Sequence, residues 1–412
     1  MATIPSIAMI PSGVKASKLY SVLPTNGAGD FTTTRASIAT RVNENGLIEE
    51  VAANVPRLDY SDGTCPSLLL EPIATNLVVQ SQVFSGYQAD NEIVTDNSIV
   101  SPDGTVTGAI LADSGLGGIS NVQVYENVTV DVSSTYTYSV FAKKKDLNFI
   151  ALRTNAFTTP SDGQSYFDLN LGTTLGVATG HTSKIENYGN GWYRCSITFT
   201  TDAVDTIGTI ITRLSQNGTS SAVDLDNTSN VYIWGFQFEK NSYATSYIKT
   251  VGTTQTRVAD TASGSGSSTV INSTEGVLYA EISALSDNGT YREIALSDGT
   301  TSNRIEIRYG VTNNIIQAIS RSGGVINGSI STSTYNITNF NKIAVRYKLD
   351  DVSLWVNGVK IGTDLSAIMP INLSELAFDE GSGLANFYGK TKSLQVYTTA
   401  LTDAELTTLT TI

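Results

Sequence analysis

The sequence has very little of the side chains that carry most enzyme chemistry. Its 412 residues include one histidine, His181, and two cysteines, Cys65 and Cys195. Zinc sites usually need several histidine or cysteine ligands, and a nucleophilic triad needs a histidine base, so either site would depend on His181. No Gly-x-Ser-x-Gly segment is present to supply a nucleophile. These shortages argue against zinc hydrolysis and acyl transfer.

Positive charge and long apolar runs are also scarce. The chain has 25 Lys and Arg against 38 Asp and Glu, a net charge of −13, and its basic residues are scattered. Such a surface repels phosphate backbones, so we expect no nucleic-acid partner. No stretch reaches the roughly 18 apolar residues of a transmembrane helix, and residues 1–5 lack the features of a secretory signal. We expect no membrane insertion and two free thiols in a reducing cytosol.

What the sequence does have is a β-rich texture. Thr, Ser, Asn and Gly separate short apolar stretches, and there are 19 tyrosines. Thr and Tyr suit pleated, half-exposed surfaces, whereas Asn and Gly suit turns. With 40% hydrophobic residues the chain can bury sizeable cores, and its length fits two sandwiches with an extra segment. The predicted fold class is all-β, with tandem jelly-roll β-sandwich domains.

Composition shifts predict four parts. Residues 1–75 form an irregular segment with no alternating core of its own and carry six prolines: Pro5, Pro11, Pro24, Pro56, Pro66 and Pro72. Residues 76–260 read as a jelly-roll sandwich of many short strands. Residues 261–270 contain a Gly/Ser run that favours a flexible linker open to proteases. Residues 271–412 read as a second sandwich.

Local patterns predict several individual elements. Asn45-Gly46 between two short β-capable runs predicts a hairpin, because both turn residues must accept positive φ. Residues 342–361 predict a three-strand meander with a second such turn at Asn357-Gly358. Near the end, Thr402 and Glu405 have the spacing of a capping box, which predicts one short helix.

Few residues qualify as candidates for a site. His181 lies in a loop-like segment and is expected at the surface. The glycines at 115–118 lack the third glycine of a dinucleotide loop and a following helix pattern. Asp224-Leu225-Asp226-Asn227 can present oxygen ligands to calcium, although a polar turn before the next strand is favoured. Trp192-Tyr193 and Trp234 can form a sugar-stacking platform, although core packing is favoured. We therefore predict no catalytic, cofactor-binding or metal-ligating residue, with calcium the one cofactor left open.

Acidic pairs and polar loops leave two further alternatives open. With 38 acidic residues some pair always lies together, and no spacing singles one out for glycan cleavage. In the C-terminal sandwich the loops 286–290 and 379–384 are rich in Asp, Asn, Ser and Gly, which suit sugar hydroxyls or calcium. We expect this domain to bind a glycan weakly without catalysis, or to serve as a spacer.

The C-terminal part resembles the laminin-G-like, concanavalin-A-like jelly roll. The matching stretches are Ala344-Val345-Arg346-Tyr347, Leu354-Trp355-Val356-Asn357-Gly358-Val359, Leu394-Gln395-Val396-Tyr397 and Ala400-Leu401-Thr402-Asp403-Ala404-Glu405-Leu406. This resemblance implies a fold, since such domains bind glycans, bind proteins or only fill space.

The first 260 residues resemble modules of bacteriophage head-spike, head-fibre and tail-fibre proteins. The matching stretches are Arg35-Ala36-Ser37-Ile38-Ala39-Thr40-Arg41-Val42, Gly46-Leu47-Ile48-Glu49, Pro56-Arg57-Leu58-Asp59-Tyr60, Leu68-Leu69-Leu70-Glu71-Pro72, Thr75-Asn76-Leu77, Gly189-Asn190-Gly191-Trp192-Tyr193-Arg194-Cys195, Trp234-Gly235-Phe236-Gln237-Phe238-Glu239, Ala244-Thr245-Ser246-Tyr247-Ile248 and Arg257-Val258-Ala259-Asp260. Lys249 departs from the proline expected there.

This second resemblance implies a non-enzymatic structural protein of a phage particle, made in the bacterial cytoplasm. We expect a head fibre or capsid decoration that attaches to capsid or other virion proteins. Because residues 1–75 are rich in proline and lack an alternating core of their own, we expect them to make this attachment and to fold fully only in the assembly. The resemblance also implies a homotrimer and contact with host surface glycans. Two alternatives are a tail-fibre receptor-binding subunit and a capsular polysaccharide depolymerase.

Overall fold

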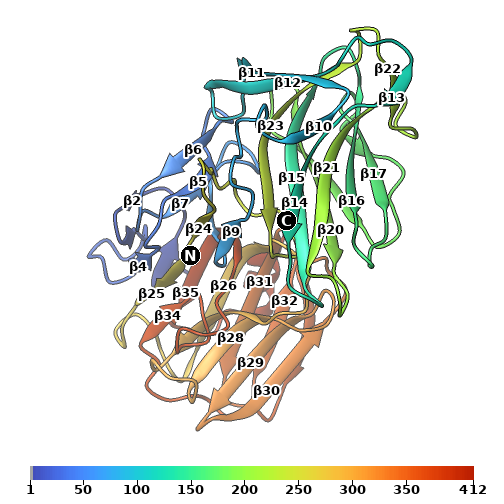
Figure 1. Ribbon diagram of the computed structural model, residues 1–412. Coiled ribbons are helices and arrows are strands. Elements are labelled where there is room, and N and C mark those ends of the chain that lie inside the picture. The colour runs from blue at the N-terminus through green and yellow to red at the C-terminus, as the bar shows by residue number, and fades with distance from the viewer. Residues whose placement is uncertain (1–2) are drawn as a thin grey trace. The chain divides into compact units, whose positions relative to one another are not determined.

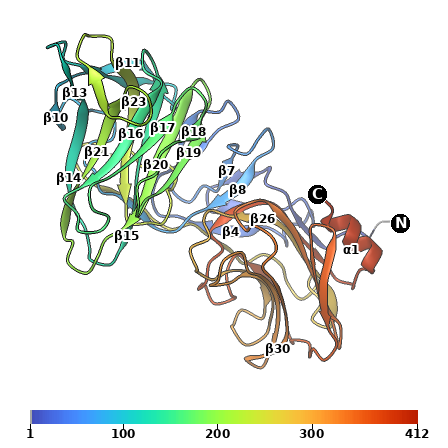
Figure 2. The same cartoon turned by 90° about the vertical axis from the view of Figure 1, so that its right-hand side faces the viewer.

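The computed structural model describes residues 3–412, and nearly all of its regular structure is β-strand (Figures 1 and 2). The chain forms two compact units. Unit 1 comprises Met1–Ile38, Val51–Pro72 and Val258–Ile412, and unit 2 comprises Ala39–Glu50 and Ile73–Arg257. The all-β fold class is as the sequence predicts. Within residues 3–412, no helix has the length and apolar character needed to cross a membrane.

Unit 2 is a sandwich of two six-stranded antiparallel sheets. The first sheet, in spatial order, contains β10 (Gln88–Asp90), β14 (Gln123–Thr129), β21 (Ile207–Ser215), β16 (Phe149–Asn155), β17 (Gly163–Asp168) and β18 (Thr173–Thr174). The second contains β11 (Glu92–Val100), β12 (Val106–Asp113), β23 (Asn230–Glu239), β15 (Thr135–Lys144), β20 (Trp192–Thr200) and β19 (Thr182–Asn187). Three small pairs complete the unit: β13 (Ile119–Asn121) with β22 (Ala222–Asp224), β9 (Ala74–Asn76) with β24 (Gln255–Arg257), and β5 (Ala39–Val42) with β6 (Ile48–Val51).

Period-two alternation explains how these strands share a core. Along β15, Tyr136, Tyr138 and Val140 belong to the buried cluster between the two sheets. Phe141 points to the other side of the sheet, where it packs in a second aromatic cluster with Trp234. Because successive side chains alternate between faces, one apolar strand supplies both clusters.

Unit 1 is a second sandwich. Its larger sheet contains β33 (Val359–Asp364), β32 (Val352–Val356), β31 (Asn341–Lys348), β26 (Glu275–Ala284), β35 (Gly389–Tyr397), β8 (Ser67–Leu70) and β7 (Arg57–Asp59), with β1 (Ile7–Met9) also paired to β35. The facing sheet contains β30 (Val325–Thr332), β29 (Ile316–Ser322), β28 (Arg304–Tyr309), β27 (Arg292–Ser297) and β34 (Glu375–Ala377). A four-stranded sheet contains β2 (Val14–Lys15), β3 (Lys18–Leu19), β4 (Phe31–Thr34) and β25 (Thr261–Ser263).

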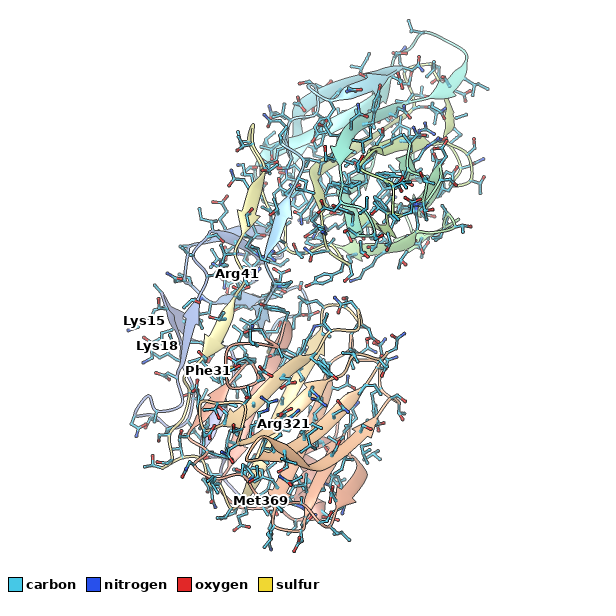
Figure 3. The ribbon with its side chains drawn as sticks, turned by 60° about the horizontal axis from the view of Figure 1, so that its bottom comes forward. Lys15, Lys18, Phe31, Arg41, Arg321 and Met369 are labelled. Carbon is cyan, nitrogen blue, oxygen red and sulfur yellow. The ribbon has the colours of Figure 1, made fainter. Side chains whose placement is uncertain are left out.

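Most of the N-terminal segment, Met1–Ile38 and Val51–Pro72, is part of this second sandwich, which corrects the predicted boundary at residue 75. Ile7 on β1 pairs with Val396 on β35, and Leu70 on β8 pairs with Gly389 further along the same strand. Phe31, labelled in Figure 3, is fully buried and lies 5.2 Å from the ring of Phe378. The segment lacks an alternating core of its own because its apolar residues complete a core built mostly by residues 271–397. These pairings form within a single chain, which corrects the expectation that the segment folds fully only in the assembly.

The Gly/Ser run is also folded, which corrects the predicted linker at 261–270. Thr261 to Ser263 form β25, which pairs with β4 in the N-terminal segment. Ser265 is fully buried, and its hydroxyl donates to the Gly29 carbonyl at 2.8 Å. Small residues fit here because the backbone itself is packed: a Cβ on Gly266, whose φ is +98°, would meet Ile271 at 2.6 Å. Composition alone could not distinguish such packing from flexibility.

Four charged residues from distant parts of the sequence form a buried ion cluster in unit 1: Arg35, Arg57, Glu71 and Asp260. Arg35 donates to Asp260 at 2.9 Å, Arg57 pairs with Glu71 at 2.5 Å, and Arg57 also pairs with Asp260. The Glu71 backbone N–H donates to Asp260 at 2.9 Å. All four are at most 4% exposed, so each charge is neutralised by its neighbours rather than by water.

The elements predicted from turn and cap chemistry are present. Gly46, with φ of 76°, closes the β5–β6 hairpin of unit 2. Asn45 does not take the positive φ predicted for it, because the turn runs from Asn43 to Gly46, whose N–H donates to the Asn43 carbonyl at 2.9 Å. Asn357 and Gly358, with φ of 50° and 82°, join β32 to β33 in the predicted meander. The helix α1 (Asp403–Thr410) begins with the predicted capping box of Thr402 and Glu405. Its buried Leu406 covers the outer face of the larger sheet of unit 1 with Trp355.

Candidate functional site

His181 is buried rather than exposed, contrary to the surface position expected for it. It is 9% exposed, and its ring nitrogens lie 2.9 Å from the Thr154 hydroxyl and 3.0 Å from the Ser165 hydroxyl. Burial lowers the pKa of His181 to about 4, so the ring is neutral near pH 7. Both hydroxyls belong to fully buried residues, which leaves a substrate no route to this serine–histidine pair. Its role is to satisfy polar groups in the core.

The tryptophans form core, as favoured above. Trp192 is 2% exposed and Trp234 is fully buried. Their indole N–H groups donate to the Val100 carbonyl at 3.1 Å and to the Thr107 hydroxyl at 3.0 Å. Neither ring face is available to a sugar.

The two groups of residues considered for calcium use their oxygens locally. Asp226 accepts hydrogen bonds from the backbone and the hydroxyl of Thr228, as in a polar turn. In the C-terminal loops, Asp379 accepts from the backbones of Gly381 and Gly383, and Asp287 accepts from Asn314. Over residues 3–412, no group of three or more His, Cys, Asp or Glu side chains is arranged to hold a metal ion.

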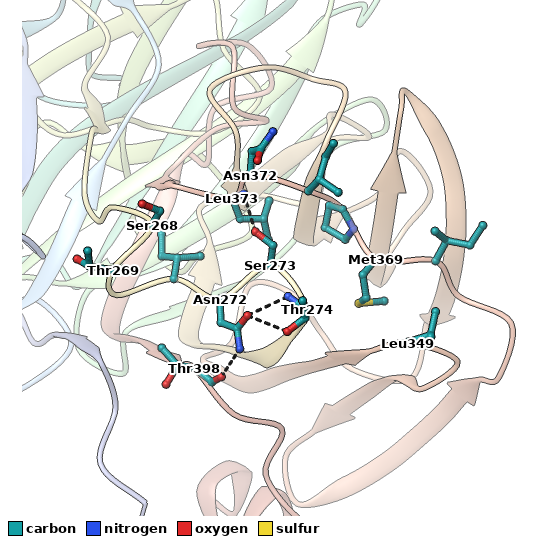
Figure 4. A pocket seen from close by; sticks show the side chains of 14 residues that line it. Ser268, Thr269, Asn272, Ser273, Thr274, Leu349, Met369, Asn372, Leu373 and Thr398 are labelled. Carbon is teal, nitrogen blue, oxygen red and sulfur yellow. Dashed lines mark hydrogen bonds between the residues drawn. The ribbon is translucent and has the colours of Figure 1, made fainter.

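A cleft of about 920 Å³ lies beside the loops before β26 and before β34 in unit 1 (Figure 4). Asn272 is fixed on its floor, donating to the Thr398 carbonyl at 2.9 Å and accepting from Thr274. The rim carries exposed apolar side chains, among them Leu349, Ile368 and Ile371. The lining residues include no charged and no aromatic side chain, so the cleft offers few groups for orienting a sugar.

The open face with the most polar chemistry lies on unit 2. It is the outer side of the sheet formed by β10, β14, β21, β16 and β17, facing away from the core, and we call it the arginine face. Cross-strand register places its residues in two neighbouring rows. The first row is Asp90, Gln123, Arg213, Ala151 and Tyr166, and the second is Gln88, Tyr125, Ile211, Arg153 and Gln164.

A chain of hydrogen bonds runs across this face. Gln123 donates to Asp90 at 2.6 Å and accepts from Nε of Arg213. Arg213 in turn donates to Gln164 at 3.1 Å, and Gln164 donates to the Tyr166 hydroxyl at 2.5 Å. Arg213 reaches from β21 past β16 because the residue between them, Ala151, is small. These hydrogen bonds hold the long side chains in one arrangement.

Arg213 carries its charge without an anionic partner. It is 8% exposed, and within residues 3–412 its hydrogen bonds go only to the amide oxygens of Gln123 and Gln164. Burial and then the neighbouring Arg153 lower the pKa of the Arg213 guanidinium to about 10. The group is still protonated near pH 7, in surroundings that disfavour its charge. An anion placed beside it would relieve that penalty.

Arg153 lies on the adjacent strand with its own binding capacity partly unused. Its Nη2 donates to Asn155 at 2.8 Å and contacts the exposed carboxylate of Asp162 at 3.0 Å. Its Nε is buried with no hydrogen-bond partner. Half-buried tyrosines, Tyr125 and Tyr166, lie on either side of the two arginines. The face combines fixed donors with aromatic rings, which is the chemistry of a saccharide or acid-binding surface.

The other polar sheet face, on β27, β28 and β29 of unit 1, is balanced internally. Arg304, Arg308 and Arg321 contact Glu306, which is fully buried, at distances up to 3.9 Å. Glu293 also contacts Arg304 at 3.8 Å, and burial raises the pKa of Glu293 to about 7. Arg321 is labelled in Figure 3 on this sheet. Since each of these arginines already contacts a carboxylate of the protein, the cluster stabilises the sheet and offers no unpaired charge to a ligand.

The sequence analysis missed the arginine face. A signal was present in the strand patterns: Arg153 and Arg213 each stand at an outward position of a strand whose other residues are mostly apolar, Phe149–Asn155 and Ile207–Ser215. That pattern predicts an outward position for each arginine but does not predict that the two are neighbours. The two arginines are 60 residues apart in the sequence, so only the pairing of β16 with β21 brings them together.

No protein-family model matches the sequence, and no curated protein sequence matches it. Among solved structures, the Ruminococcus gnavus IT-sialidase CBM40 aligns with a TM-score of 0.31 and 19% identity over 36% of this chain and 88% of that one. Mouse laminin alpha1 domains LG4-5 align with a TM-score of 0.24 and 10% identity over 78% of this chain and 88% of that one. Trypanosoma rangeli sialidase aligns with a TM-score of 0.29 and 11% identity over 92% of this chain and 77% of that one. Likenesses at this level carry no inference about binding or catalysis.

Proposed function

We propose that this protein is a non-catalytic structural component of a bacteriophage particle, a head fibre or capsid decoration, that contacts host surface glycans through the arginine face. The glycan contact rests on one observation: Arg213 is buried and charged without a carboxylate partner, on a face where Arg153 and two tyrosines lie alongside.

Support for the particle role comes from the blocks that resemble phage proteins. Several of their residues are the ones that hold the interior together, including all four members of the buried ion cluster. In unit 2, Arg194 donates to the Thr245 carbonyl at 2.6 Å, and Glu239 accepts from the Thr245 backbone at 2.9 Å. The blocks are thus features of a shared architecture, and they favour a family of scaffolds over a family of catalysts.

A non-catalytic role is favoured by the chemistry of the candidate pairs. The serine–histidine pair at His181 is enclosed, and the Glu293–Glu306 pair lies under arginines at 2% exposure or less. A depolymerase would need an acidic pair open to the glycan. The homotrimer stays a prediction from resemblance. The attachment role of residues 1–75, expected from the prolines of that segment and its lack of an alternating core, also stays a prediction.

The test uses the whole chain and intact particles. We expect purified protein to bind immobilised host surface polysaccharide, and Arg213→Gln to reduce that binding at least tenfold, since a hydrogen bond to a charged group contributes about 1.5–3 kcal/mol. Antibody labelling of particles should mark the head. Labelling of the tail would favour the receptor-binding alternative, and release of reducing ends over hours would show an enzyme instead.

A further inference from the structure

We infer that the arginine face takes an acidic saccharide, and that Arg213 and Arg153 bind its carboxylate. This inference rests on the proposed glycan contact and adds the chemical class of the ligand. A neutral sugar would satisfy hydrogen bonds but would leave the Arg213 charge without a counter-charge. A carboxylate supplies two oxygens in a plane, which matches the planar fork of a guanidinium.

The distribution of acids around the face supports this choice. Asp90 joins the row of hydrogen bonds through Gln123, and Asp162 contacts Arg153 from an exposed position. Asp162 is 61% exposed in its side chain, so an ion pair with it is worth little and a ligand carboxylate can replace it. Both acids favour the Arg213 charge from a distance, but neither contacts its guanidinium directly, which leaves room for a ligand carboxylate beside it.

Arg213 is also held ready for such a ligand. Its Nε and Nη1 donate to amide oxygens on strands to either side, so the guanidinium plane is fixed before binding. On the neighbouring strand, Nη2 of Arg153 pairs with the exposed Asp162 carboxylate at 3.0 Å, a contact that a ligand carboxylate can take over. Fixed donors lose little conformational entropy on binding, which favours recognition of one acid group by two arginines.

The net charge of −13 restricts where an acidic glycan can bind. Overall repulsion weakens any non-specific attraction of a polyanion, so an acidic glycan binds only where local positive charge outweighs the general field. Binding should therefore be confined to the arginine face. It should also weaken with salt less than contact with a scattered basic surface would, because the groups are partly buried.

The experiment compares two matched oligosaccharides on the full chain. One contains glucuronic acid, and the other is the same oligosaccharide with each carboxyl group reduced to an alcohol, which leaves glucose. Calorimetry should give at least tenfold tighter binding of the acid form by the wild type. Arg213→Gln and Arg153→Gln should each remove most of that difference. Lys184→Gln, which removes one positive charge from an exposed position on the other sheet of unit 2, should leave it unchanged.

The outcomes separate this inference from the proposed function. Equal binding of the two forms that is still lost in Arg213→Gln would overturn the acid preference while keeping the glycan contact. A sialic-acid oligosaccharide and inorganic sulfate serve as further probes: sulfate binding as tight as the saccharide would show an anion site without sugar recognition and overturn the inference. If no oligosaccharide binds while all variants keep the wild-type melting temperature, the acid preference and the proposed glycan contact both fail.

Discussion

At the scale of single residues, Trp192, Trp234 and His181 are all buried and all hydrogen-bonded to groups on other strands or loops. Trp192 and Trp234 were expected in the core because bulky rings on alternating strands usually pack there. His181 was expected at the surface because its neighbours are glycine, threonine and serine. Two of its partners, Thr154 and Ser165, lie on strands distant in the sequence, so no local pattern could indicate its burial.

The buried ion cluster should respond strongly to the loss of its shared acid. Asp260→Ala leaves Arg35 and Arg57 with one buried carboxylate between them, which should lower the free energy of unfolding by about 3–5 kcal/mol. Asp62→Ala, which removes an acid at a partly exposed pair with Lys390, should change it by no more than about 1 kcal/mol. Denaturant unfolding measures both variants, and equal effects would contradict the assigned role of Asp260.

Glu293 should make stability depend on pH in a predictable direction. Its folded-state pKa of about 7 lies above the ordinary 4.5, so the folded protein keeps a proton that the unfolded chain gives up. That contribution is fully present below about pH 4.5 and is lost as the pH rises through about 7.

Glu293→Gln keeps the neutral form at every pH and should remove this dependence. We expect the variant to be more stable than the wild type by about 1–3 kcal/mol at pH 8, with the difference shrinking toward pH 5. Glu44→Gln, at an exposed hairpin position, is the control. A difference between Glu293→Gln and wild type that stays constant from pH 5 to pH 8 would refute the shift.

At the scale of elements, prediction succeeded where a few adjacent residues determine the structure. The Asn357-Gly358 turn needs two positive φ values, and the α1 cap needs one hydroxyl and one carboxyl three residues apart. Both are therefore determined by residues that are close together in the sequence. The strands β1 and β8 have no such local signal. They are short, and what defines them is their partner β35, which lies more than 300 residues further along.

The edge position of β1 gives a direct test of this docking. Ile7→Asp places a charge at a fully buried position paired with Val396, and it should destabilise unit 1 by more than about 3 kcal/mol. Ile4→Asp, three residues earlier at a position 76% exposed, should change stability by less than about 0.5 kcal/mol. Thermal unfolding compares them, and similar melting temperatures for the two variants would show that β1 is dispensable.

At the scale of the whole molecule, the two units are not consecutive along the chain. The division between units falls at four places, after Ile38, Glu50, Pro72 and Arg257. Composition shifts predicted the all-β class and two sandwiches, but they cannot reveal that the first and last segments share one core. The predicted boundary near residue 260 is close to the last division because unit 1 resumes there.

This arrangement predicts how the chain responds to cutting. A protease site inserted between Gly264 and Gly266 should be cleaved slowly, because the run is paired with β4 and with Leu376. After cleavage the two pieces should elute as one peak in native gel filtration and separate only in denaturant, since β1 and β8 stay paired with β35. Separation in native buffer would contradict the shared core.

The pairing of β1 with β35 also has a consequence for synthesis on the ribosome. Ser6 bonds to the Val396 carbonyl across 390 residues, so the first strand emerges from the exit tunnel long before its partner is translated. At roughly 5–20 residues per second, that wait lasts on the order of tens of seconds. Unit 2 can fold during this time, while the apolar side chains of the nascent N-terminus stay exposed to chaperones. Slower translation would therefore lengthen the time during which these apolar side chains lack their β35 partner.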